Sequence, residues 1–181
     1  AFWLGPQQAA IFAEPIERLR IRREMEKTRV DLGRGFLVQE GGGERRTLEQ
    51  ASDGKDLILL HFWSPWHREC ELYLPQLSEI AASLKELGMA TAFLLVQAEE
   101  ELLPDARKMR EPLVKGEVTW LLDRADATLA QQLRVQNLPL TVVLDREGRV
   151  LFHGETGSPE MWEALVTLRP EIAKVRPKEQ G

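Results

Sequence analysis

Cysteine is nearly absent from this sequence, since Cys70 is the only one among 181 residues. A single cysteine excludes an intramolecular disulfide and with it the class of small disulfide-held domains. Long apolar runs are missing too. The longest, at 57–60 and 92–96, fall far short of the roughly 20 residues that cross a bilayer. Any thiol chemistry of this chain must therefore use one sulfur atom.

An excess of charge of one sign is also lacking. The chain has 24 Lys and Arg residues against 29 Asp and Glu residues, a net charge of −5, which argues against a nucleic-acid partner. Because 43% of the residues are hydrophobic, the chain can bury a core and is not wholly disordered. Its first residue is Ala1 and not Met, so we expect an upstream signal peptide or anchor to have been removed.

The first part of the chain is predicted to be an arm. Residues 15–29 form a highly charged helix with a partial apolar stripe. Its basic residues favour a solvated helical face over a membrane or polyanion contact, and packing on a partner chain is the sharper alternative. A loose hairpin over 35–47 follows, with Gly41-Gly42-Gly43 at its turn.

Alternating strands and helices are predicted after this arm. The run LILLHFW at 57–63 is apolar except for His61, which indicates a central strand covered on both faces. The further strands are expected at 90–96, 118–122, 141–144 and 149–153, and the helices at 66–87, 100–114, 125–133 and after Ser158-Pro159. This pattern predicts an α/β fold with a mixed sheet and helices on both faces.

Two ordered motifs carry a family resemblance. The segment FWSPWHREC at 62–70, followed by Leu74-Pro75, lies where the buried strand turns into a helix. The segment NLPLT at 137–141 precedes VVLDREGRV at 142–150. Over about residues 36–169 the chain resembles the thioredoxin superfamily. Within this superfamily the chain most resembles the tethered, extracytoplasmic TlpA-like and ResA-like proteins. Their pattern is FWAxWCxxC, followed by an acidic residue and a proline.

The resemblance implies a thioredoxin-like domain over 35–169, between an arm at 1–34 and a polar tail at 170–181. It also implies a periplasmic or otherwise extracytoplasmic location, and it allows a membrane tether upstream of residue 1. In this family the matching proline is cis and presents backbone groups to an extended peptide beside the active site. The implied partner-binding residues are Trp66, His67, Leu138 and Pro139.

The chain departs from the family pattern at two positions. His67 stands where the family has its attacking cysteine, and Tyr73 stands where this branch has an acid three residues after the second cysteine. Thiol-disulfide exchange needs an exposed thiolate and a second thiol that resolves the mixed disulfide. Cys70 occupies the position that is ordinarily shielded, so we expect it to react slowly.

His67 and Cys70 are the candidate catalytic residues, but their pairing permits other chemistry. At a helix start, the backbone dipoles favour the neutral imidazole. A spacing of three residues puts both side chains on one helix face, which allows a His–Cys hydrogen bond or two ligands of a metal site. Nothing in the sequence brings His61 or His153 to the same place. We therefore favour a polar helix-start residue with a buried thiol, and expect no metal and no cofactor.

Three functions remain open at the level of sequence. The first is a redox-inactive thioredoxin-like module that binds a protein partner or belongs to a larger envelope assembly. The second is an oxidoreductase of altered, single-cysteine chemistry. The third is a metal or haem handling protein that uses His67 and Cys70.

Overall fold

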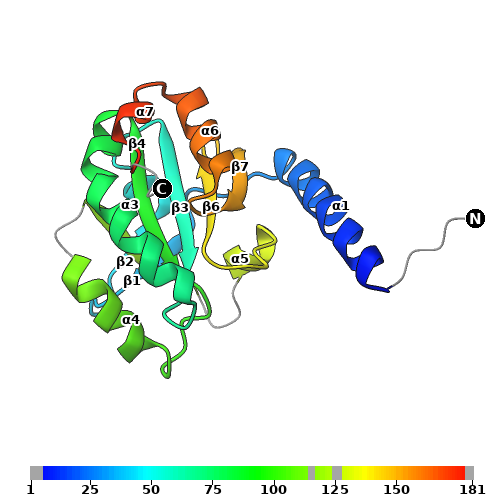
Figure 1. The fold of residues 1–181 in the computed structure, drawn as a ribbon. Coiled ribbons are helices and arrows are strands. Elements are labelled where there is room, and N and C mark those ends of the chain that lie inside the picture. Colours follow the sequence, from blue (N-terminus) through cyan, green and yellow to red (C-terminus); the bar gives the residue numbers. More distant parts are fainter. Residues whose placement is uncertain (1–5, 114–116, 124–127, 178–181) are drawn as a thin grey trace, which may run out of the picture.

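A mixed β-sheet organises the fold (Figure 1). The computed structural model describes residues 6–113, 117–123 and 128–177, and within them seven strands pair in the order β2-β1-β5-β4-β3-β6-β7. The strands are β1 Gly35–Val38, β2 Arg45–Thr47, β3 Leu57–Trp63, β4 Met89–Leu95, β5 Val118–Leu122, β6 Leu140–Leu144 and β7 Val150–Glu155. β3 is parallel to β4 and antiparallel to β6, which confirms a mixed α/β sheet with β3 inside it.

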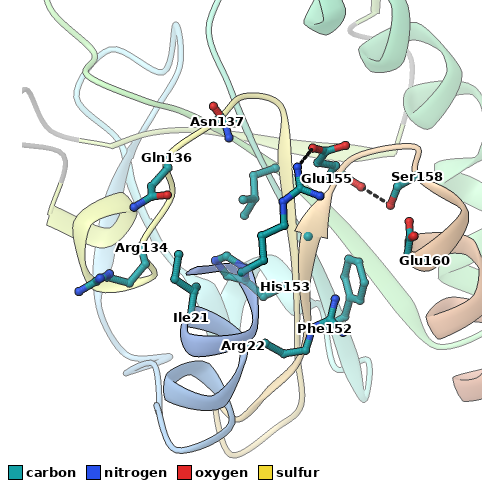
Figure 2. Close-up of a pocket in the computed structure, with 13 residues that line it drawn as sticks. Ile21, Arg22, Arg134, Gln136, Asn137, Phe152, His153, Glu155, Ser158 and Glu160 are labelled. Carbon is teal, nitrogen blue, oxygen red and sulfur yellow. Dashed lines mark hydrogen bonds and ion pairs between the residues drawn. The ribbon is translucent and has the colours of Figure 1, made fainter. Parts of the chain in front are cut away.

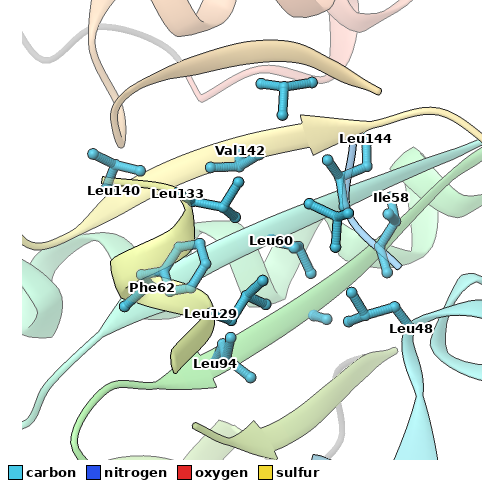
Figure 3. Packing of buried hydrophobic residues seen from close by; sticks show 14 of the residues in the cluster. Leu48, Ile58, Leu60, Phe62, Leu94, Leu129, Leu133, Leu140, Val142 and Leu144 are labelled. Carbon is cyan, nitrogen blue, oxygen red and sulfur yellow. The ribbon is translucent and has the colours of Figure 1, made fainter. Parts of the chain in front are cut away.

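Helices cover both faces of this sheet. They are α1 Pro6–Glu26, α2 Leu48–Ser52, α3 Arg68–Glu86, α4 Leu103–Arg110, α5 Thr128–Gln132, α6 Pro159–Leu168 and α7 Ile172–Val175, with a 3-10 turn, η1, at Glu111–Leu113. On one face α1, α2 and α5 pack against alternate residues of β3, β4 and β6 (Figure 3). On the other face α3, α4, α6 and α7 pack against the intervening residues. No helix among the described residues is long and apolar enough to span a membrane.

The arm differs from its prediction. Its helix begins at Pro6 rather than at residue 15, because proline is well suited to the first position of a helix and good helix formers follow it. Figure 1 shows α1 extending away from the sheet at the β7 side. Its last turns still join the domain core, since Ile21 and Met25 are buried in the same cluster as Val30. Residues 1–5 lie outside the described residues.

The C-terminal segment also differs from the polar tail that the sequence predicts. Ile172 in α7 is fully buried against the cluster of α3 and α6, and the Arg169 side chain donates to the Leu87 carbonyl at 2.9 Å. One apolar residue among charged ones gives no periodic signal, so sequence patterning does not detect this helix. Residues 178–181 lie outside the described residues. So do residues 125–127 of one predicted helix and residue 114 of another.

Candidate functional site

The junction between β3 and α3 positions the candidate site. All seven residues of β3 are buried, and four residues separate the end of the strand from the start of α3. The Ser64 hydroxyl accepts from the Trp66 amide at 3.2 Å, and the Ser64 carbonyl accepts from the His67 amide at 3.3 Å. His67 is the N-cap residue of α3, but its side chain makes no cap hydrogen bond. These backbone contacts hold Trp66 and His67 outward at the helix start.

The Cys70 thiol lies inside the core. Its exposed fraction is 0%, and it packs in one cluster with Trp63, Leu74 and Phe93. Burial raises the pKa of Cys70 to about 11, with a smaller contribution in the same direction from Glu69 and an opposing hydrogen bond from the Ser64 backbone. The thiol is therefore protonated at neutral pH.

His67 and Cys70 do not form a joint site in the structure. The imidazole of His67 is exposed, the thiol is buried, and no hydrogen bond connects the two among the described residues. The same residues contain no group of three or more His, Cys, Asp or Glu side chains arranged to hold a metal ion.

Trp66 is an exposed aromatic residue with a fixed orientation. Its exposed fraction is 62%, and its indole Nε1 donates to Oδ2 of Asp105, in α4, at 2.9 Å. This hydrogen bond links the turn before α3 to a second helix. An exposed aromatic side chain that is held in one orientation is typical of recognition sites, because it loses little conformational entropy on binding.

The loop before β6 approaches the same cluster. The Leu138–Pro139 peptide bond is cis, and the Pro139 carbonyl accepts from the Thr156 amide at 3.2 Å. Leu138 is half-buried and packs against the cluster that contains Cys70. Among the described residues its backbone N–H and C=O have no hydrogen-bond partner. Leu138 thus has two backbone groups open to hydrogen bonding, and its side chain packs against the cores on both faces of the sheet.

Sequence reasoning missed a buried polar chain beneath α3. His61 shares the sheet face of Trp63, its Nδ1 lies 2.8 Å from the Thr141 hydroxyl, and Thr141 lies 2.7 Å from the Thr156 hydroxyl. Its Nε2 is buried without a partner. Burial lowers the pKa of His61 to about 3. The signal in the sequence was one polar residue within an apolar strand.

Tyr73 fills the space beside Gly157, which has a φ of 79°. A Cβ atom on Gly157 would lie 2.3 Å from Cε1 of Tyr73. We expect Gly157→Ala to lower the free energy of unfolding by about 2–4 kcal/mol, through backbone strain and overpacking. Urea denaturation measures this change.

Gly54→Ala is the matched control for this variant. Gly54 has a similar φ of 73° but no atom within 4 Å of its Cβ position, so only the backbone cost remains, about 1 kcal/mol. Adding Tyr73→Ala to Gly157→Ala should recover part of the loss. Equal losses for the two alanine variants would show that Tyr73 does not occupy this space.

Comparison with known proteins places these observations in a family. A family model described as thioredoxin-like matches residues 54–150, more than half of the chain. The chain belongs to the thioredoxin-like family. This match spans β3, the start of α3 and the Pro139 loop, so both motifs of the site lie within it.

Solved structures share the thioredoxin-like fold. A putative thiol:disulfide interchange protein DsbE from Chlorobium tepidum is 20% identical, covers 82% of this chain and 98% of its own, and has a TM-score of 0.59. The exposed lipoprotein thioredoxin Etrx1 from Streptococcus pneumoniae is 16% identical, covers 76% and 98%, and has a TM-score of 0.58. At these identities the likeness establishes the fold alone.

A curated protein matches over a shorter part of its length. Glutamate–tRNA ligase 2 of Parvibaculum lavamentivorans is 32% identical over an alignment 119 residues long, and the alignment covers 60% of this chain and 24% of that protein. The chain therefore spans about a quarter of the length of this relative.

Proposed function

We propose that this chain is a redox-inactive, extracytoplasmic thioredoxin-like subunit that binds a protein partner. The observation that carries the proposal is the pair at the start of α3: an exposed imidazole at His67 and a fully buried thiol at Cys70. Exchange requires a thiolate that a disulfide can reach. A protonated, enclosed sulfur beside an exposed non-thiol residue does not meet this requirement.

The surface around the helix start supports partner binding. Trp66 offers an exposed indole fixed by Asp105, and Leu138 offers open backbone groups. An extended peptide segment can use both features, because main-chain hydrogen bonds supply affinity and an aromatic anchor supplies specificity. The partner is a protein or a larger envelope assembly. One protein of the same fold, Etrx1, is an exposed lipoprotein, which supports the extracytoplasmic part of this proposal.

Two measurements on the wild-type chain test redox inactivity. In an insulin-type disulfide reduction assay, wild type and Cys70→Ala should give the same background rate. A bulky thiol reagent at pH 7 should modify Cys70 at least about a hundredfold more slowly in the native chain than in urea, because a pKa of about 11 leaves little thiolate. Turnover above the Cys70→Ala background, or fast native modification, would favour single-cysteine chemistry instead.

Crosslinking tests the binding surface separately. A photo-reactive residue at position 66, used in an envelope extract, should give a discrete adduct with one protein. The same residue at position 72 is the control, because Leu72 is an exposed apolar residue of α3 with a similar exposed fraction, 56%. Equal adducts at both positions would contradict a recognition site at Trp66.

A further inference from the structure

A groove runs alongside β7, which is an outer strand of the sheet. Two cavities of about 170 Å³ and 340 Å³ lie along this strand, between α1 and α6. They share four lining residues, Arg22, Phe152, His153 and Glu160, so they form one continuous depression, the β7 groove. Figure 2 shows the smaller cavity, with Arg22 and Ile21 on α1 and Glu160 near the start of α6.

The floor of the β7 groove presents open backbone groups. Hydrogen-bonded and non-hydrogen-bonded pairs alternate along an antiparallel ladder. Because the Thr156 amide donates to the Pro139 carbonyl, the pairing of Val142 with His153 is a non-hydrogen-bonded one. The N–H and C=O of His153 therefore point away from β6. The N–H has no hydrogen-bond partner among the described residues, and the C=O is contacted by the imidazole of the same residue, which leaves one of its two lone pairs open.

The chain itself already places extended backbone on one end of this edge. Arg29 forms an isolated antiparallel bridge with Arg149, and the Val30 amide donates to the Gly148 carbonyl at 2.8 Å. This contact ends where β7 begins. At the other end of β7, the Glu155 carbonyl accepts from the Ser158 amide at 3.3 Å and from the Ser158 hydroxyl at 2.8 Å. The open part of this edge is therefore centred on His153.

The two walls of the β7 groove carry opposite charge. The α1 wall contributes Arg18 and Arg22, with Glu26 at one end, and the α6 wall contributes Glu160 and Glu163. Arg18 pairs with Glu155 on β7 at 3.3 Å. Arg22, Glu160 and Glu163 have no ion-pair partner among the described residues. The unpaired charges thus face each other across the groove without bridging it.

A second copy of the chain does not suit this groove. Antiparallel pairing of two β7 strands about a twofold axis would extend one continuous sheet. The α1 helices would then meet on one face and the α6 helices on the other. Arg22 would approach its own copy, as would Glu160, and such like-charge contacts disfavour association.

We infer that the β7 groove binds an extended segment of a partner protein in which acidic and basic residues alternate. Successive side chains of a strand point to opposite faces. A segment added to β7 would therefore direct its acidic residues toward Arg22 and its basic residues toward Glu160 and Glu163. Its backbone would pair with His153. This site uses different residues from the Trp66 surface and stands independently of it.

Synthetic peptides test the charge pattern. A capped octapeptide of alternating Glu and Lys is titrated into the full chain at low salt, alongside a control peptide of four Glu followed by four Lys. The alternating peptide should bind about tenfold more tightly, and added salt should weaken its binding. No binding, or equal binding of the two peptides, would overturn the inference.

N-methylation tests strand addition. In an extended peptide the amides of all Glu residues point to one edge and those of all Lys residues to the other. Two modified peptides are compared, one N-methylated at every Glu amide and one at every Lys amide. One of them should no longer bind, and the other should bind like the parent peptide. If both modified peptides bind like the parent, or neither binds, addition to a single strand edge is wrong.

Two charge reversals on α1 locate the site. Arg22→Glu should weaken the alternating peptide by about tenfold. Arg23→Glu makes the same change one residue along the helix, at an exposed residue that does not line the groove, and should leave binding unchanged. Equal effects of the two variants would place the peptide elsewhere. If either variant fails to fold, the N-methylation experiment on the wild-type chain still tests whether the peptide adds to a strand edge.

Discussion

The His67→Cys variant is expected to form an internal disulfide with Cys70 and to gain turnover with a disulfide substrate. His67 is the exposed N-cap residue of a helix of 19 residues, and Cys70 lies three residues further on. A thiol at position 67 would face the unpaired N–H groups of the first helical turn, which lower a thiol pKa below its usual value of about 8.5. The new thiolate would supply the nucleophile that wild type lacks.

Mass spectrometry before and after mild oxidation measures the disulfide as the loss of two hydrogens. The insulin-type assay should show slow exchange for His67→Cys and only background for wild type. Tyr73 keeps the rate below that of a normal reductase, because proton transfer to and from Cys70 has no neighbouring carboxylate at that position. His67→Cys with Cys70→Ala is the control. A folded His67→Cys chain that never bridges would show that the alignment of this helix start is wrong.

Acid should destabilise the native state through His61. The pKa of His61 falls from 6.5 to about 3 on folding. Above pH 6.5 the side chain is neutral in both states. Between pH 6.5 and about 3 the unfolded chain binds a proton that the native chain does not. The free energy of unfolding therefore decreases by about 1.4 kcal/mol for each unit by which the pH is lowered. By pH 3 the accumulated loss is about 5 kcal/mol.

Urea denaturation of wild type and His61→Leu over pH 8 to 3 measures this contribution. The variant should show a shallower fall in the free energy of unfolding, by about 1.4 kcal/mol per pH unit below pH 6.5. Thr141 keeps its contact with Thr156 in the variant, so no buried hydroxyl loses its only partner. His153 is half-buried and has a pKa lowered mainly by burial, so it contributes in the same direction in both proteins. Parallel profiles would contradict a neutral, buried His61.

The central strands could be predicted from sequence because their signal is local. The run at 57–63 is apolar, short and bounded by turn residues, and it forms β3 with the same limits. Helix α6 could be predicted equally well, since Ser158 caps it and Pro159 occupies its first position. Such signals depend on neighbouring residues alone.

Other features depend on residues far apart in the chain. β1 pairs with β5 as well as with β2, and the network of His61, Thr141 and Thr156 joins three separate segments. The burial of Ile21 and Ile172 is likewise set by tertiary packing. At the site, the positions of His67 and Cys70 followed from the family resemblance. The hydrogen bond of Trp66 to Asp105 had no signal in the sequence.

The bridge between Arg29 and Arg149 makes the first thirty residues a cover for one side of the sheet. With Ile21 and Met25 in the core and Val30 against Gly148, removal of this segment would free the backbone at residues 148 and 149, just before β7, and so lengthen the open strand edge. It would also strip apolar surface from the neighbouring face. Exposed strand edges beside apolar surface promote aggregation. The smallest fragment of this protein that we expect to resist aggregation therefore starts with α1 and not at Gly35, where the sheet begins.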